Sequence, residues 1–454
     1  MSLRENCHYS TGDNAAMERI RHRSTRSRAR SGASWRVLSS ALALGVFLGG
    51  CDVLDNALSV EAPGMVDAGL MDDPDNAHLL VSGTIADFEC ALGAYIVNSG
   101  LLGNELRDAS VTASRFPLDS RNINDTSPYG TNGCNGNPPG IYRPLATAIW
   151  TSNNALNLLQ QWTDAEVANR TDLIAQAAAY SGYSHTLMGE GFCSTVIEEL
   201  GPEVQPGQVF AAAEARFTQA IEAAQAAGND KILNLAQLGR ARARLNQGNL
   251  TGAAADARAV LGRDAEFEVF ATASVTESRR YNRVGAEFWA GNITVDPSFR
   301  GLTVDGVPDP RVEAFDTDDL GHDSATPVWM VTKYGTSYGA GIRENPVPVA
   351  SWREARLIIA EAEGGQEAVD QINALRDHWG LPHFTSSDED EIRQQVIEER
   401  SRELYLEGHH LWDLRRFNLP QTPAVGEPYR QGGVYGDVRC FPLPAVERNN
   451  NRDV

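Results

Sequence analysis

Apolar residues recur at helical spacing over residues 397–416, near the C-terminal end of the chain (IEERSRELYLEGHHLWDLRR). The members of this apolar stripe are Val396, Ile397, Leu404, Tyr405, Leu411 and Leu414. Because their spacing follows the turns of an α-helix, the stretch is predicted to be amphipathic, with one buried face.

The polar face of the same stretch carries charges that can pair. Glu398 and Arg402 stand four residues apart, the spacing at which helical side chains meet. Gly408 interrupts the pattern and lowers helix propensity there. We expect it either to permit a close helix crossing or to divide the stretch into two helices.

Further stretches are also predicted to be helical, at residues 78–98, 141–162, 172–192, 208–227 and 230–261. Residues 230–261 resemble a tetratricopeptide repeat, with Gly248 at the turn and small Ala253 and Ala257 in the second helix. Residues 213–224 resemble the second helix of a preceding unit. Such units bury their faces only by stacking, and an ordinary helical hairpin is the alternative.

Two regions lack this periodicity. Residues 116–140 are rich in Asn, Asp, Gly and Pro, which predicts a long surface loop, and loops of this length are often functional. Residues 265–350 are rich in Gly, Pro, Asp and aromatics, with short strand-like pieces such as residues 328–334. Helical sequence resumes at Ser351.

The order of residues in the C-terminal stretch resembles the E-R-x-R-E-L-x-x-E-G-x-x-x-x-D-L-R-R signature of the SusD/RagB family of surface nutrient-binding lipoproteins. The matching positions are Glu399, Arg400, Arg402, Glu403, Leu404, Glu407, Gly408, Asp413, Leu414 and Arg415. His410 departs from the family, whose members usually carry Arg there.

Two upstream blocks and the tail extend the resemblance. Residues 352–363 (WREARLIIAEAE) resemble the family's R-x-A-E-x-x-L-x-x-A-E-A block, with Ser351 at the usual Arg. Residues 372–382 (INALRDHWGLP) resemble its L-N-x-V-R-x-R-A-G-L-P block, and residues 440–444 resemble its closing F-P-I-P segment. Residues 265–350 match only in general character.

The first 51 residues resemble a bacterial lipoprotein signal. Basic residues precede an apolar run over residues 37–48, and Leu48-Gly49-Gly50-Cys51 resembles a lipobox. We expect Cys51 to carry a diacylglycerol, whose acyl chains would hold the protein to a membrane. The alternatives are an uncleaved anchor and a soluble secreted protein. Translation could also begin at Met17, and Asp52 leaves the leaflet open.

Charge and cysteine content narrow the function classes. Residues 1–51 hold eight Arg and three acids, so the remaining chain has 31 basic and 57 acidic residues, a net charge of −26. Such a surface repels phosphate backbones, so we expect no nucleic-acid partner. Without Cys7 and Cys51, four cysteines remain (Cys90, Cys134, Cys193 and Cys440). They permit two structural disulfides in three possible pairings.

The resemblance implies a mainly α, SusD-like fold with tetratricopeptide-like helix pairs and a loop-rich, irregular region with a few short strands. We expect a signal peptide (1–51), an acidic tether (52–76) and one SusD/RagB-like domain (77–454). The domain would comprise a helical half (77–264), a loop-rich, ligand-facing region (265–350) and the C-terminal signature helices and tail (351–454).

By resemblance, the chain would sit lipid-anchored at the outer membrane, facing the exterior, on a SusC-like TonB-dependent transporter. It would capture an oligomeric nutrient, glycan or peptide, and deliver it for import. A periplasmic tetratricopeptide scaffold that binds another protein is the first alternative. A secreted carbohydrate-active enzyme is the second.

We predict no catalytic residue, metal ligand or cofactor. The chain has no H-E-x-x-H, Walker loop or G-x-G-x-x-G, and His409 and His410 are expected on a helix surface, pointing about 100° apart. The signature residues are expected to form buried or half-buried ion pairs and caps that fix the last helices. They are Glu361, Arg376, Glu403, Glu407, Gly408, Asp413 and Arg415.

Ligand recognition is expected from aromatic faces in the loops, with polar side chains beside them. The aromatic candidates are Tyr129, Tyr281, Trp289, Trp329, Tyr334 and Tyr338. The polar candidates are Asn132, Asn135, Asn137, Asn282 and Arg283. The alternative for each aromatic is a place in the core, where Trp and Tyr are often found.

Overall fold

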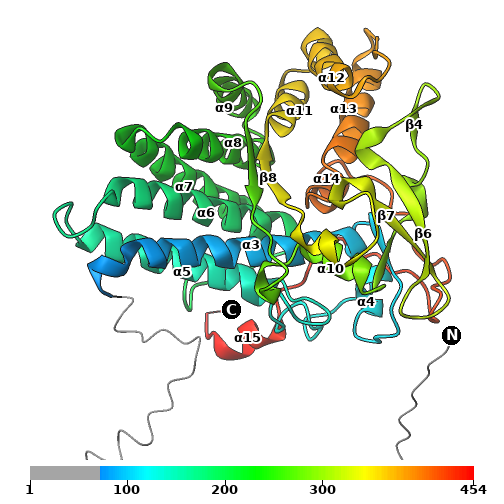
Figure 1. The fold of residues 1–454 in the computed structure, drawn as a ribbon, viewed down its shortest axis with the longest axis horizontal. Helices are drawn as coiled ribbons and strands as arrows, with labels where there is room; N and C mark the ends of the chain where they lie inside the picture. The colour runs from blue at the N-terminus through cyan, green and yellow to red at the C-terminus, as the bar shows by residue number, and fades with distance from the viewer. Residues whose placement is uncertain (1–71, 454) are drawn as a thin grey trace, which may run out of the picture. The chain divides into compact units, whose positions relative to one another are not determined.

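The computed structural model describes residues 72–453, so the expected signal peptide, the expected lipidation site at Cys51 and most of the expected acidic tether lie outside the described residues. Helices dominate the described part, which confirms the mainly α fold. The longest described helix, α3 (Ala77–Leu102), follows a 3-10 turn, η1 (Pro74–Asn76), and packs against α5 (Tyr142–Gln161) (Figure 1).

One described segment, Pro74–Leu102, is long and apolar enough to cross a membrane by length and composition. However, 67% of its most apolar window is buried inside the protein. Tyr95, Ile96 and Val97 are fully enclosed by neighbouring elements. A helix that is apolar around most of its circumference and covered in this way belongs to the core of the domain.

Successive helices stack beside one another to form the helical layer. α5 is followed by α6 (Arg170–Gly191), α7 (Pro206–Ala227), α8 (Asp230–Asn246) and α9 (Leu250–Arg263), each packed against the next (Figure 1). Phe217 of α7 shows why α6, α7 and α8 approach closely. A Cβ on Gly182 of α6 would lie 2.6 Å from its ring, and one on Gly239 of α8 would lie 2.3 Å from it. The two glycines therefore leave the space that this fully buried ring fills.

Local signals set the helix ends in this layer. The Asn229 side chain accepts a hydrogen bond from the backbone N–H of Ile232 and caps α8, and Asn249 caps α9 through Gly252. Gly248, between them, has a φ of +78°. Because glycine adopts this left-handed conformation without steric cost, the chain reverses at the position predicted for the turn.

The C-terminal helices continue the layer. α11 (Trp352–Glu363) packs against α8 and α9, and α12 (Gly365–Trp379) and α13 (Glu389–Glu403) pack against α11. α14 (His410–Arg416) reaches back to α3 and α6, and α15 (Ala445–Asn450) is the last described helix.

Both alternatives that the sequence left open for Gly408 within residues 397–416 are found. α13 ends at Glu403 and α14 begins at His410, so the stretch forms two helices. Gly408 lies in the break with a φ of +86°, and a Cβ there would approach the Tyr95 ring to 3.1 Å. Gly408 therefore both divides the helices and permits close packing on α3. The expected pairing of Glu398 with Arg402 is confirmed.

Within the described residues, the strands form four two-stranded antiparallel sheets. They are β1 (Leu106–Asp108) with β3 (Ile293–Val295), β2 (Glu268–Ala271) with β8 (Val347–Ser351), β4 (Thr303–Val304) with β5 (Val307–Pro308), and β6 (Ala314–Leu320) with β7 (Pro327–Val331). The strand expected over residues 328–334 stops at Val331, where a 3-10 turn, η5 (Thr332–Tyr334), begins.

Two disulfides brace the loops against the helices. Cys90 of α3 bonds Cys134, and Cys193, just after α6, bonds Cys440 in the C-terminal tail. The predicted surface loop over residues 116–140 is therefore only partly a surface loop. It begins with a short helix, α4 (Phe116–Asp119), and Arg121 and Tyr129 within it are buried.

Candidate functional site

Three side chains from separate segments form an aromatic–guanidinium cluster, defined here as Tyr281, Trp289 and Arg343. The Arg343 guanidinium lies 4.8 Å from the ring centroid of Tyr281 and 4.5 Å from that of Trp289. Trp289 ends the short helix α10 (Arg283–Trp289), and its side chain is 44% exposed. The cluster thus presents an aromatic surface beside a positive charge.

Backbone contacts hold α10 against the segment that carries Arg343. Asn282 caps α10 by accepting a hydrogen bond from the backbone N–H of Gly285 (3.0 Å), and its own N–H donates to the Arg343 carbonyl (2.8 Å). A Cβ on Gly285 would lie 2.4 Å from the Ile342 carbonyl oxygen, so only glycine permits this approach of α10 to η6 (Ala340–Glu344).

Tyr338 secures the other end of α10. Its hydroxyl donates to the carbonyl oxygens of Phe288 and Trp289, each at 3.1 Å. Burial, with a smaller contribution from Asp319, raises the pKa of this hydroxyl above its ordinary value. Because it stays protonated at neutral pH, it remains a donor and fixes the backbone from which the Trp289 side chain projects.

A buried ion network lies beneath α10. The Arg115 guanidinium contacts Glu287 of α10 at 2.9 Å and Asp108 of β1 at 3.0 Å. Burial opposes the positive charge, but the two carboxylates outweigh it and raise the pKa of Arg115 above its ordinary value. Since breaking a buried pair leaves an uncompensated charge, the network ties α10 to the segment before α4.

The 116–140 loop contacts the segment that leads into the cluster. Its exposed Asn135 donates a hydrogen bond to the Ser278 hydroxyl at 3.3 Å, three residues before Tyr281. The other polar candidates serve their own surroundings: Asn132 donates to the Pro138 carbonyl, Asn137 accepts from Arg115, and Arg283 lies 3.6 Å from Glu287.

Two aromatic candidates are placed where a ligand cannot reach them, so their assignment as ligand contacts is wrong. Tyr129 is 1% exposed, and its hydroxyl donates to the Pro442 carbonyl (2.7 Å). Tyr334 is fully buried, and its hydroxyl donates to the Leu406 carbonyl (2.7 Å). Each side chain packs as core and satisfies its one polar group through a backbone oxygen.

The remaining aromatic candidates reach the surface. Tyr281 and Trp289 belong to the cluster, and Tyr338 supports it. Trp329 of β7 is half-buried, with the Arg300 guanidinium 5.1 Å from its ring. Arg343 was missed at the sequence level, because nothing in the 335–346 stretch indicates that it meets rings more than fifty residues upstream.

One pentapeptide has the G-x-S-x-G spelling of a serine nucleophile, at residues 335–339 (GTSYG). In hydrolases that spelling marks a sharp strand-to-helix turn with a histidine nearby. Here Ser337 lies in an exposed bend between η5 and η6, and no described contact joins it to a histidine. The surroundings do not form a nucleophile elbow.

Several signature residues meet around Glu403 in the core. Its carboxylate accepts from Trp379 Nε1 at 3.0 Å and lies 3.2 Å from Arg353 and 3.5 Å from Arg311. Burial raises the pKa of Glu403 to about 7 despite these cations. Arg311 and Arg376 also share Glu399, with Arg376 at 2.7 Å.

The other signature residues link α14 to its neighbours. Asp413 pairs with Arg400 at 2.9 Å and with Arg416 at 2.7 Å, and Arg416 also pairs with Glu361. Glu407 lies 2.6 Å from Lys333 Nζ. Arg415 donates to the carbonyl oxygens of Glu190 and Phe192 at the end of α6, at 3.0 and 3.2 Å.

The sequence indicated that both histidines lie on a helix surface, but this is wrong for His409; His410 begins α14 and is half-buried. His409 is 6% exposed and lies 3.2 Å from Arg242, and burial together with that cation lowers its pKa well below the ordinary value. The neutral ring accepts a hydrogen bond from the guanidinium. Among the described residues, no group of three His, Cys, Asp or Glu side chains is placed to hold a metal ion.

Known proteins resemble the C-terminal third of this chain in sequence and most of the chain in fold. The sequence profile of the SusD family matches residues 327–441. The starch-binding protein SusD of Bacteroides thetaiotaomicron is 30% identical over 118 residues, which cover 24% of this chain. That alignment spans about a fifth (21%) of the relative's length.

Solved structures share the fold over most of the chain. A SusD-like carbohydrate binding protein from Bacteroides vulgatus has a TM-score of 0.64 at 15% identity, covering 84% of this chain and 97% of that one. A laminarin binding SusD-like protein has a TM-score of 0.61 at 16% identity (84% and 98%). Surface glycan-binding protein A from Bacteroides thetaiotaomicron has a TM-score of 0.60 at 11% identity (84% and 98%). Together with the profile match, which spans the three signature blocks, these structures show that the chain has a SusD-like fold.

Proposed function

We propose that this protein binds oligosaccharides at the aromatic–guanidinium cluster and passes them on uncleaved. The observation that carries the proposal is the exposed Trp289 ring held beside Arg343. A pyranose ring offers an apolar C–H face that can stack on such an indole, and its hydroxyls can accept hydrogen bonds from a guanidinium.

The names of the relatives support a carbohydrate as the ligand class. They are described as starch-binding, laminarin binding and glycan-binding proteins. The acidic balance of the chain beyond residue 51 favours a neutral sugar over a polyanionic one, since like charges repel. A peptide is the alternative ligand.

Binding without catalysis fits the same site. Glycoside hydrolysis needs two carboxyl groups flanking the scissile bond at a set separation. The cluster supplies two rings and a guanidinium, and the nearest carboxylate of α10, Glu287, is buried in its ion pair with Arg115. We therefore assign capture and release to this chain and bond cleavage to another protein.

We propose further that the protein is a lipoprotein of the outer membrane and delivers its ligand to a SusC-like TonB-dependent transporter. The lipobox ending at Cys51 and the family resemblance support this placement. The stacked helices α5 to α9 suit a tetratricopeptide-like contact surface for that partner, because such stacks offer extended faces.

Exchange of Trp289 tests the binding site. In full-length protein, Trp289→Ala should weaken binding to laminarin or soluble starch at least tenfold, because loss of a central aromatic anchor commonly costs about 2 kcal/mol or more. Isothermal titration calorimetry measures the affinity, and the melting temperature should stay within a degree or two. Leu250→Ala, at an exposed position on α9, is the matched control. Unchanged affinity in Trp289→Ala would contradict the site.

Exchange of Cys51 tests the membrane anchor. Cys51→Ala should move the protein from the membrane fraction to the soluble fraction, since the lipid chains would be lost. Fractionation with immunoblotting gives the readout, and copurification of the unaltered protein with a large barrel protein separates transporter delivery from a periplasmic scaffold. Full membrane retention of the variant would contradict lipidation.

A further inference from the structure

A concave site elsewhere in the molecule is lined by none of the three residues of the aromatic–guanidinium cluster. We call it the α5–α15 groove. Its volume is about 680 Å³, within the range of small-molecule sites. One wall is the N-terminal part of α5, the facing wall is the 196–200 loop with α15, and Gly130 and Thr131 border it.

Three large apolar side chains, of a kind usually buried in a monomeric protein, are exposed in the groove. Trp150 of α5 is 55% exposed, Leu200 is 61% exposed and Val446 of α15 is 41% exposed, and all three line the same groove. Scattered exposed apolar residues need no explanation, but three facing one cavity mark a binding site.

Polar groups stand on both walls around the Trp150 ring. Arg143 and Asn153 come from α5, and Glu198, Glu199, Glu447 and Asn450 come from the facing wall. Arg143 is exposed and has no ion pair in the described part of the chain. An indole face with a guanidinium, amides and carboxylates beside it can stack on a sugar ring and bond its hydroxyls. The excess of carboxylates disfavours an acidic sugar.

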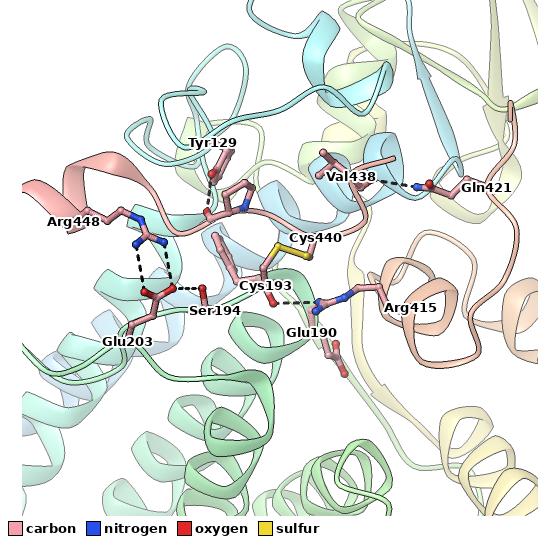
Figure 2. Close-up of a disulfide and its surroundings, with 12 residues drawn as sticks. Tyr129, Glu190, Cys193, Ser194, Glu203, Arg415, Gln421, Val438, Cys440 and Arg448 are labelled. Atoms are coloured by element: carbon pink, nitrogen blue, oxygen red, sulfur yellow. Dashed lines mark hydrogen bonds and ion pairs between the residues drawn. A yellow bond between two sulfur atoms is a disulfide. The ribbon is translucent and has the colours of Figure 1, made fainter. Parts of the chain in front are cut away.

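The two parts of the facing wall, the 196–200 loop and α15, are fastened together before any ligand arrives. The Cys193–Cys440 disulfide joins the segment before the 196–200 loop to the tail before α15 (Figure 2). Arg448 lies 3.3 Å from Glu203, and Asn451 donates to the Gly201 carbonyl at 2.7 Å. A site held in one shape loses less entropy when it binds.

The same bracing reaches the border of the groove. Tyr129 donates to Pro442 in the tail, and Cys134 is bonded to Cys90 of α3 (Figure 2 shows Tyr129 above the tail). Thr131 lines the groove, and Asn135, four residues later, donates to Ser278, which lies three residues before Tyr281 of the cluster. The Cα atoms of Thr131 and Asn135 are separated by at most about 14 Å, so one short stretch of chain joins the groove to the segment that leads into the cluster.

We infer that the α5–α15 groove is a second binding site for a neutral oligosaccharide, so that one polymer chain can occupy both sites at once. The inference rests on the proposed function, since it assigns the same ligand class to the new site. Two sites joined by one ligand raise the apparent affinity for a long polymer without strengthening either contact.

Isothermal titration calorimetry on the full-length protein tests whether the groove is a second site. The short probes are laminaritriose and maltotriose, and the polymers are laminarin and soluble starch. The unaltered protein should bind two short oligosaccharides, Trp150→Ala and Trp289→Ala one each, and the double variant none. Each single variant should bind the polymer at least tenfold more weakly. Leu250→Ala should match the unaltered protein, and Trp150→Phe should recover part of the polymer affinity.

The possible failures are distinguishable. A single oligosaccharide site that only Trp289→Ala removes would overturn the groove and leave the proposed function intact. Failure of the unaltered protein to bind any of the four glucans would overturn both. A dimer in sedimentation that Trp150→Ala dissociates, with unchanged glucan binding, would assign the groove to a second copy of the chain and overturn the inference.

Discussion

At the scale of single residues, the most unusual feature is a set of buried carboxyl groups with high pKa values. Burial raises the pKa of Glu105 to about 8 and the pKa of Glu354 to about 7. The Glu105 carboxyl accepts one hydrogen bond, from the backbone N–H of Leu406 (2.8 Å). Lys333 stabilises its charged form, whereas Asp413 and Glu407 disfavour it. The folded protein therefore holds this proton more tightly than the unfolded chain does.

Stability should fall as pH rises from about 4.5 to 8 because of these groups. A raised carboxyl pKa contributes stability that is fully present below the unfolded value and is lost as pH passes the folded value. The loss is about 1.4 kcal/mol for each pH unit that separates the two pKa values. Glu105→Gln should weaken this dependence and raise the melting temperature at pH 8 relative to the unaltered protein. Thermal melts from pH 5 to 8.5 measure it, with Glu222→Gln, exposed on α7, as the control.

A Glu105→Gln variant with the same pH profile as the unaltered protein would contradict this account. The buried Glu354 and Glu403 shift in the same direction. Some of the dependence should therefore remain in the variant.

Residue-level function was only partly predictable from sequence. Tyr281, Trp289 and Tyr338 reach the surface as proposed, but Tyr129 and Tyr334 do not. All five stand outside the long stretches of regular apolar spacing, where no periodicity separates an inward from an outward ring. Arg343 and Trp150 were missed for related reasons. Arg343 contacts the Tyr281 and Trp289 rings only through the folding of the chain, because these residues are far from it in sequence. Trp150 lies outside the apolar stripe of α5, so the stripe did not point to it.

At the scale of elements, the signature stretch forms two helices around a left-handed break. Heptad spacing ran through that break without a gap, so periodicity alone could not locate it. The glycine did carry the signal, because a φ of +86° excludes most other residues. Elsewhere, as in α5 and α11, the 3.6-residue pattern did predict the helices, because a long apolar stripe with that period fits few structures other than a helix with one buried face.

Gly408→Ala should destabilise the protein by about 1–3 kcal/mol, because the left-handed conformation is unfavourable for alanine and its Cβ presses on Tyr95. Urea denaturation gives the free energy of unfolding. Gly262→Ala is the matched control. It lies within α9 with no atom within 4 Å of the added Cβ, and should stabilise by up to about 1 kcal/mol. Equal effects of the two exchanges would contradict the backbone argument.

At the scale of the whole molecule, disulfides connect elements that are distant in sequence. Cys193–Cys440 closes a separation of 247 residues, and Cys90–Cys134 closes one of 44. The four cysteines and their even number predicted two bridges. The pairing could not be predicted, because it depends on how the tail returns to the end of α6.

Removal of the longer bridge should cost more stability than removal of the shorter one. In the chain-entropy account the difference is about 1.5 kcal/mol, within total costs of about 2–5 kcal/mol each. Urea denaturation of two double variants measures this difference in the free energy of unfolding. One variant carries Cys193→Ser with Cys440→Ser, and the other carries Cys90→Ser with Cys134→Ser. A larger loss from the Cys90–Cys134 pair would show that local packing, not loop closure, sets the contribution.

The Cys193–Cys440 bond also makes residues 193–440 a covalent ring, which encloses α7 to α14 and the loop-rich region between them. A single protease cut anywhere inside that ring opens it without separating the pieces. Nicked protein should therefore migrate as one species on a non-reducing gel and as two after reduction. With this bond intact, the protein keeps its C-terminal helices attached even after a surface loop has been clipped.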